Sequence, residues 1–197
     1  MQDMTEKIHI GGICGSLREG SYNLMLLRAA AASLPEEVSY EEIPIGNLPL
    51  YNPDFDGAQA PEAARDFRGR VAATDGLLFA VPEYNYSMTA ALKNALDWAS
   101  RPIGASALND KPAAIMGASQ GAFGTVRAQL HLRHVAVYTN LHLVNKPEVL
   151  VREPHLKFAA DGRLVDEDTR KLVEQLGQEL VRWTRLLRAG RAALAAR

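Results

Sequence analysis

The most informative stretch of this sequence is Leu77-Leu78-Phe79-Ala80-Val81 followed directly by Pro82-Glu83-Tyr84-Asn85-Tyr86-Ser87. Its first five residues form a short apolar run, which is typical of a parallel strand buried on both faces. Residues 89–100 have helical apolar spacing, so residues 82–87 are predicted to form a loop between a strand and a helix. Open α/β sheets bind ligands at the carboxyl ends of their strands. With two tyrosines, a carboxylate and an amide, this loop suits a planar ligand that forms hydrogen bonds.

Strands and helices alternate along the rest of the chain. We expect strands at residues 7–14, 38–43, 77–81, 113–118 and 141–144, the last extended by residues 149–151. We expect helices at residues 23–33, 62–73, 89–100 and 125–138, and a final helix that Asp166 caps, that Gly190 interrupts and that frays over residues 191–197. This alternation predicts one α/β domain over residues 1–197, a flavodoxin-like three-layer sandwich with five parallel strands in the order 2-1-3-4-5. Trp98 lies off the apolar stripe of its helix, so we expect it at a core edge or at a subunit contact.

Composition excludes several classes of protein. The 197 residues are 47% hydrophobic and 23% charged, with a formal net charge of −1, which argues against a nucleic-acid partner. No run approaches the roughly 20 apolar residues of a membrane helix, and residues 1–7 lack the apolar core of a signal peptide. Cys14 is the single cysteine, so no intrachain disulfide can form, and we expect a cytoplasmic protein.

Three strand-to-helix loops are predicted to meet at one edge of the sheet. They follow the first, third and fourth strands, at residues 15–22, 82–87 and 119–124. In the order 2-1-3-4-5 these strands are neighbours, so their carboxyl ends line one crevice at the switch point of the sheet. The three loops are therefore expected to form a single composite binding site.

The first loop has the features of a phosphate cradle. Ser16, Ser21 and Asn23 offer side-chain donors, Arg18 can fork onto a phosphate, and the following helix start supplies N–H groups. The Gly-Lys-Ser/Thr of a P-loop and the three spaced glycines of a dinucleotide fingerprint are both missing. A monophosphate without magnesium therefore fits better than a nucleoside triphosphate. The alternative is that Ser21 or Asn23 merely caps the helix.

The other two loops suit a ring. In the second, Asn85 or backbone groups could match the donors and acceptors of a pyrimidine-type ring, and the alternative is a tight turn with surface tyrosines and a solvated Glu83. In the third, glycines allow close approach of backbone N–H groups to a ring oxygen, and the alternative is a flexible connector. Its residues are Ser119-Gln120-Gly121-Ala122-Phe123-Gly124.

Together these segments resemble the NADPH-dependent FMN reductase family, including its quinone- and chromate-reducing members. The likeness spans about residues 7–150 and rests on Gly15-Ser16-Leu17-Arg18 with Ser21 and Asn23, on residues 82–87 and 92–98, and on residues 117–124 with Arg127. The resemblance implies a flavodoxin-like fold with noncovalent FMN, whose phosphate is held by Ser16, Arg18, Ser21 and Asn23. It implies that Pro82, Glu83, Tyr84 and Asn85 border the isoalloxazine ring, and that Ser119, Gln120 and Gly121 close over its other side. Many relatives have Gly where this chain has Gln120.

The resemblance also implies an activity and an assembly. It implies hydride transfer from NADPH or NADH to FMN, then electron transfer to quinones, free flavin, azo compounds or oxidised metal anions such as chromate. The flavin carries this chemistry, so we assign no catalytic side chain and no metal site. Similar proteins are commonly homodimers or dimers of dimers, in which the loop holding Leu50-Tyr51-Asn52-Pro53 reaches a neighbour's flavin. The alternatives are a flavodoxin-type FMN electron carrier without nicotinamide turnover, which the near-zero net charge counts against, and a flavin-binding regulator or scaffold.

Overall fold

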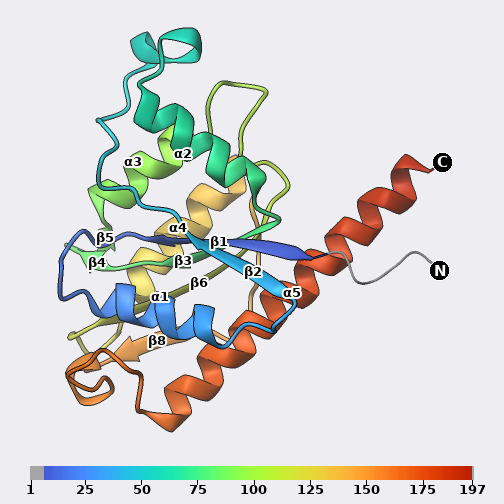
Figure 1. The fold of residues 1–197 in the computed structure, drawn as a ribbon. Helices are drawn as coiled ribbons and strands as arrows, with labels where there is room; N and C mark the ends of the chain where they lie inside the picture. Colours follow the sequence, from blue (N-terminus) through green and yellow to red (C-terminus); the bar gives the residue numbers. More distant parts are fainter. Residues whose placement is uncertain (1–6, 197) are drawn as a thin grey trace.

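A six-stranded parallel sheet forms the centre of the computed structural model, which describes residues 7–196 (Figure 1). Its strands run in the order β2 (Val38–Glu42), β1 (Ile8–Cys14), β3 (Gly76–Ala80), β6 (Pro112–Ser119) and β7 (His142–Leu143), and β8 (Val149–Arg152) also pairs with β6. Because β7 and β8 share the place beside β6, this order confirms the expected 2-1-3-4-5 arrangement.

The expected fifth strand is divided into two. β7 pairs with Pro112 and Ala113 at the start of β6, whereas β8 pairs with residues 116–119 at its end. Pro147 lies between the two short strands. A proline has no backbone N–H to donate to a ladder, so the strand cannot continue through it without a break.

Two layers of helices cover the two faces of the sheet. In β3, Leu77 and Phe79 pack in the core formed with α2 (Glu62–Ala73), α3 (Ala90–Ala99) and α4 (Val126–Thr139). Leu78 and Ala80 point to the other face and pack in the core formed with α1 (Tyr22–Ala32) and α5 (Glu167–Ala195). Figure 1 shows these layers on opposite sides of the strands, which is the predicted three-layer sandwich.

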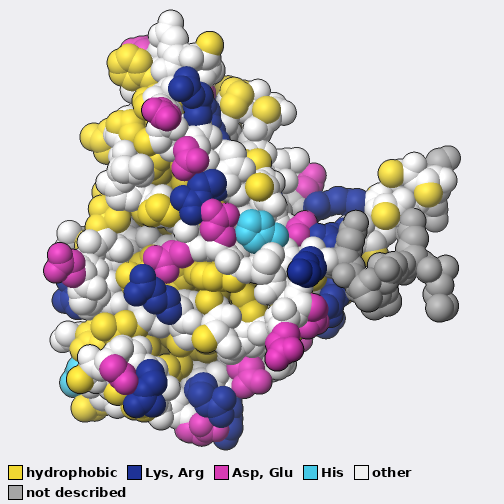
Figure 2. Space-filling model, viewed as in Figure 1, with side chains coloured by type: hydrophobic (Ala, Val, Ile, Leu, Met, Phe, Trp, Pro, Cys, Tyr) yellow, Lys and Arg dark blue, Asp and Glu magenta, His cyan; other side chains and the backbone are white. Residues whose placement is uncertain are grey.

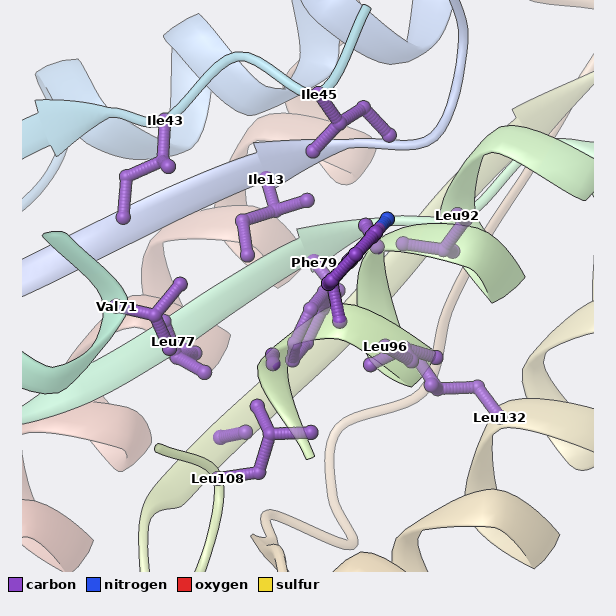
Figure 3. Close-up of a cluster of buried hydrophobic side chains, with 14 of the residues drawn as sticks. Ile13, Ile43, Ile45, Val71, Leu77, Phe79, Leu92, Leu96, Leu108 and Leu132 are labelled. Carbon is purple, nitrogen blue, oxygen red and sulfur yellow. The ribbon is translucent and has the colours of Figure 1, made fainter. Parts of the chain in front are cut away.

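Trp98 lies inside the first core and not at its edge, so the expectation of an edge or subunit contact is wrong. Its side chain is fully buried and belongs to the same cluster as Phe79 and Leu96. Figure 3 shows how Phe79 and Leu96 lie in this cluster. The indole Nε1 of Trp98 donates to the Pro49 carbonyl at 2.7 Å, and the Tyr51 ring meets it edge-on with centroids 5.0 Å apart. These contacts anchor the long loop of residues 44–60, which carries the short 3-10 helices η1 (Pro53–Phe55) and η2 (Gly57–Gln59).

The final helix, α5, is longer than the sequence predicts. Asp166 caps it as expected, with its side chain accepting from the Thr169 N–H. The helix then continues through Gly190 to Ala195, so the expected interruption at Gly190 and fraying over residues 191–195 are wrong. Arg191 holds the end by donating from Nη2 to the Asp110 carbonyl. The expectations for residues 1–6 and Arg197 lie outside the described residues.

Within residues 7–196, no helix combines the length and the apolar character needed to span a bilayer.

Replacing Gly190 by Ala should stabilise the protein. A helical glycine costs about 0.5–1 kcal/mol relative to alanine, and a Cβ at Gly190 would meet nothing within 4 Å. We expect urea denaturation of the Gly190→Ala variant to show a gain of about that size in the free energy of unfolding. Gly177→Ala is the matched control, because its Cβ would lie 3.3 Å from Leu34 Cδ2 and should gain less. An unchanged midpoint for Gly190→Ala would mean that the end of α5 is not helical.

Candidate functional site

One pocket gathers most of the predicted site residues at the carboxyl ends of β1, β3 and β6. It has a volume of about 170 Å³ and is lined by Ser16, Arg18, Ser21, Tyr22, Asn23, Pro82, Glu83, Tyr84, Ala118, Ser119, Gln120 and Pro154. All three predicted loops therefore contribute to it. Of the predicted residues, Asn85 and Gly121 do not line the pocket.

Close packing brings the first two loops together. The Gly15 N–H donates to the Ala80 carbonyl at 2.9 Å, so the first loop begins beside the end of β3. The Gly15 carbonyl accepts from Thr89 Oγ1 at 2.7 Å, and Thr89 in turn caps α3. A Cβ at Gly15 would lie 2.8 Å from Pro82 Cδ, so only glycine allows this approach of the two loops.

The first loop ends at the start of α1, where donors collect. Ser21 caps the helix by accepting from the Leu24 N–H at 3.2 Å, as the alternative prediction had it, and it also lines the pocket. The N–H groups of Tyr22 and Asn23 also belong to the first turn of α1, and they have no acceptor within the helix. The first turn of α1 contains no acidic residue, so no carboxylate competes with an anion for the positive end of the helix.

Arg18 extends from the same loop and is exposed. Its backbone N–H donates to Ser16 Oγ at 3.4 Å, and its Nη2 donates to the Gly20 carbonyl. The guanidinium has five N–H donors, so this turn orients it and leaves others for a ligand. A guanidinium, serine hydroxyls and helix N–H groups are the donors that a phosphate monoester requires.

Asn23 has a structural role that the sequence did not reveal. Its side chain is buried, and its Oδ1 accepts from the Ala118 N–H at 2.9 Å while its Nδ2 donates to the Ala118 carbonyl at 2.8 Å. This pair of hydrogen bonds joins the start of α1 to the end of β6. Asn23 therefore fixes the first loop against the third, and its side chain is only partly available as a phosphate donor.

The second loop is a short hairpin, β4 (Glu83–Tyr84) and β5 (Ser87–Met88). Its two turn residues, Asn85 and Tyr86, have φ of 50° and 65°, the backbone conformation of a type I′ turn. Asn85 thus lies at the tip of the hairpin and outside the pocket. The tight turn with surface tyrosines that we considered is present, and Tyr84, 55% exposed, also lines the pocket.

Glu83 is neither solvated nor free. One carboxylate oxygen accepts from the backbone N–H groups of Arg127 and Ala128 at 3.0 and 3.2 Å, and the other pairs with Arg127 Nη1 at 3.2 Å. The side chain of Thr125, the residue at the start of α4, makes no capping hydrogen bond. Glu83 caps this helix instead. Because Glu83 is used in this way, it is not a candidate general acid or base.

Arg127 joins the second loop to the third. Its guanidinium lies 4.0 Å from the ring centroid of Tyr86 and 4.9 Å from that of Phe123, so it stacks between one ring from each loop. The third loop is also tied to itself, because the Gly121 N–H donates to Ser119 Oγ at 3.2 Å. These contacts hold the loop in place, unlike the flexible connector that we considered, and they use the Gly121 N–H, one of the loop's N–H groups that we expected could donate to a ring oxygen.

Three lining residues were missed from the sequence. Tyr22 and Ala118 adjoin predicted residues, and Pro154 follows the end of β8. The rule that ligands bind beyond the carboxyl ends of strands could have found Pro154. Cys14 lies beneath the first loop, where burial raises the pKa of its thiol and keeps it protonated at neutral pH.

Comparison with known proteins shows the family to which the chain belongs. The sequence model of the family described as NADPH-dependent FMN reductase matches residues 8–155. The chain belongs to this family. Among its relatives is the NAD(P)H-dependent FMN reductase of Pseudomonas aeruginosa, 49% identical over 185 residues, which cover 94% of this chain and 100% of that protein.

Two further proteins are similar to this chain in sequence or in structure. The 2-hydroxy-1,4-benzoquinone reductase of Burkholderia sp. is 45% identical over 178 residues, which cover 90% of this chain and 97% of that protein. The solved structure of FerB, a flavoenzyme NAD(P)H:(acceptor) oxidoreductase from Paracoccus denitrificans, superposes with a TM-score of 0.83 at 33% identity, over 90% of this chain and 97% of that one.

The Asn23 brace should carry measurable stability. Asn23→Ala removes both hydrogen bonds to Ala118 and leaves that buried backbone without partners, which should cost about 1–3 kcal/mol of unfolding free energy. Urea denaturation of the protein without flavin measures this directly. Asn47→Ala, at an exposed asparagine, is the control and should change stability by less than about 0.5 kcal/mol. Equal stability of the two variants would refute the brace.

Proposed function

We propose that this protein is an FMN-containing oxidoreductase that takes a hydride from NADPH or NADH and passes the electrons to small acceptors, quinones first among them. The observation that carries the proposal is the convergence of three loops on one pocket in a member of the NADPH-dependent FMN reductase family. Relatives named FMN reductase and benzoquinone reductase match the chain over nine-tenths of its length, at 94% and 90% coverage.

The residues of the pocket fit a noncovalent FMN. Ser16, Arg18 and Ser21, with the N–H groups at the start of α1, would hold the phosphate, and Asn23 would contribute mainly by keeping that helix start in place. This donor set has a positive guanidinium and no acidic residue in the first turn of α1, which suits a dianionic group.

The second and third loops would border the flavin ring. Pro82 and Tyr84 offer an apolar and an aromatic surface on one side, and Ser119 and Gln120 lie on the other. Glu83, Asn85 and Gly121 would act through the shape of these loops, because the first caps α4, the second forms the hairpin tip and the third closes its own loop.

When bound, FMN supplies the hydride acceptor and the electron donor of the reaction, so no protein acid or base is required. The chain's own residues would orient the cofactor, and Tyr84, which lines the pocket, is exposed enough to leave that part of the ring accessible. An open face of this kind suits acceptors of varied shape. We include free flavin, azo compounds and oxidised metal anions such as chromate among the proposed acceptors.

We further propose a single FMN-binding domain that acts in the cytoplasm as a homodimer or a dimer of dimers, without membrane or nucleic-acid partners. Large apolar side chains on the surface support self-association. They include Leu50, Ile103, Val137 and Tyr138, which are 78–83% exposed. Leu50 belongs to the loop that Trp98 anchors, so this loop is presented in a fixed position.

Anaerobic reduction by a nicotinamide distinguishes the proposed enzyme from a flavodoxin-type carrier or a flavin-binding scaffold. The purified protein is loaded with FMN, freed of oxygen and mixed with NADPH or NADH in separate samples. We expect the visible absorbance of the flavin to disappear at a rate within the typical turnover range of enzymes, about 1–1000 per second. Addition of a quinone should restore this absorbance. A flavin that binds but keeps its colour with both nicotinamides would contradict the proposal.

A further inference from the structure

A second pocket lies at the opposite edge of the sheet, where β3 and β6 begin. It has a volume of about 310 Å³, and its polar lining comes from Thr74, Asp75, Asn109, Lys111, Arg188 and Arg191. The C-terminal part of α5 forms one wall of it through Thr184, Leu187, Arg188 and Arg191. Figure 2 shows Lys and Arg side chains interspersed with Asp and Glu side chains near the point where α5 leaves the body of the molecule. The pocket is separated from the flavin pocket by the length of the strands.

The charges lining this pocket do not balance. Asp75 is its single carboxylate within the described residues, and it is already used, since it accepts from the His9 N–H at 2.8 Å and pairs with Arg188 Nη2 at 2.6 Å. Lys111 and Arg191 therefore remain as two cations without a carboxylate of their own in the lining, in a chain whose net charge is −1.

Both of these cations keep hydrogen atoms for which residues 7–196 offer no acceptor. Lys111 Nζ donates to the carbonyls of Thr74 and Ala72, at the negative end of α2, and an ammonium has three donors. Arg191 donates from Nη2 to the Asp110 carbonyl, and a guanidinium has five donors. These bonds are to backbone oxygens, and they orient the two side chains. The Asp110 carboxylate does not line the pocket, but a hydrogen bond with His142 and the nearby Arg191 guanidinium both lower its pKa, so the positive charge of Arg191 is offset only from outside the pocket.

We propose that this pocket binds a small dianionic oxyanion, the phosphate or sulfate group of a free anion or of a phosphorylated small molecule, between Lys111 and Arg191. A planar guanidinium can form two parallel hydrogen bonds to such a group, and the ammonium adds a point charge. The bound anion would join the start of β6 to the end of α5, two elements far apart in the sequence. The pocket is distinct from the proposed flavin site and needs no flavin chemistry.

The ionisation of Lys111 gives the site a pH dependence. Burial lowers the pKa of Lys111 to about 8, with Asp75 opposing and Arg191 reinforcing this shift. The other charged or titratable groups around it are Arg188 from α5, and Asp110 with His142, whose Nε2 lies 3.2 Å from Asp110 Oδ1. An anion favours the charged ammonium, so affinity for sulfate, which remains a dianion, should fall as the pH rises from 7 to 9.

Calorimetric titration tests the site directly. The protein is first loaded with one equivalent of FMN and freed of excess flavin, so that added anions cannot occupy the phosphate cradle and free FMN cannot occupy the second pocket. It is then titrated with sodium sulfate at constant ionic strength. We expect one saturable site per chain at pH 7 and weaker binding at pH 9. Arg191→Gln should weaken binding about tenfold, the effect of losing roughly one charged hydrogen bond.

The matched control is Arg182→Gln on the same helix, whose arginine pairs with Glu179 and does not line the pocket. It should bind sulfate as the natural sequence does. Lys111→Met should also weaken sulfate binding. If the Lys111→Met variant fails to fold, the Arg191→Gln variant alone tests whether the pocket binds the anion.

Parallel titrations with inorganic phosphate and with glycerol 3-phosphate identify the source of the group. Tighter binding of inorganic phosphate assigns the site to a free anion, and tighter binding of the ester assigns it to a phosphorylated small molecule. The absence of saturable binding for all three probes, or an equal loss in the Arg191 and Arg182 variants, would overturn the proposal.

Discussion

The candidate flavin site depends on the two hydrogen bonds between the Asn23 amide and the backbone of Ala118. A parallel sheet brings the ends of β1, β3 and β6 to one edge, but adjacency of strands does not fix the loops that follow them. Asn23 supplies this constraint, since it ties the start of α1, which follows β1, to the end of β6. The proposed phosphate donors of the first loop are thereby held at a set position relative to the third loop.

The second and third loops are also held in place by contacts within the chain. Thr89 and Glu83 use their polar atoms to fasten the second loop to the first loop and to α4. Arg127 then stacks between rings of the second and third loops. Some residues that the family resemblance assigns to the cofactor thus serve the geometry of the site. Exposed neighbours such as Arg18 and Tyr84 remain the proposed contacts of the ligand. Because contacts within the chain fix the shape of these loops, the entropy cost of ordering them around a ligand would be low.

The sequence predicted the strand order, the helices and the three loops, because these follow from apolar periodicity and from topology rules. It did not predict the roles of Asn23 and Glu83, because their partners Ala118 and Arg127 are 95 and 44 residues away. Trp98 was misplaced for the same reason, since its indole bonds to the distant Pro49. The interruption at Gly190 was inferred only from the low helix propensity of glycine. The structure of the whole helix overrides this local preference, since α5 continues through Gly190 to Ala195.

Titration of the flavin-free protein with FMN tests most directly whether these loops form one flavin site. Binding is followed by the loss of flavin fluorescence, and we expect one FMN per chain. Arg18→Ala should weaken binding by about 1–3 kcal/mol, because a charged hydrogen bond to the phosphate is lost. Arg65→Ala, at an exposed arginine of α2, should bind FMN unchanged. Failure of the natural protein to bind FMN, or equal affinity in the Arg18 and Arg65 variants, would contradict this assignment.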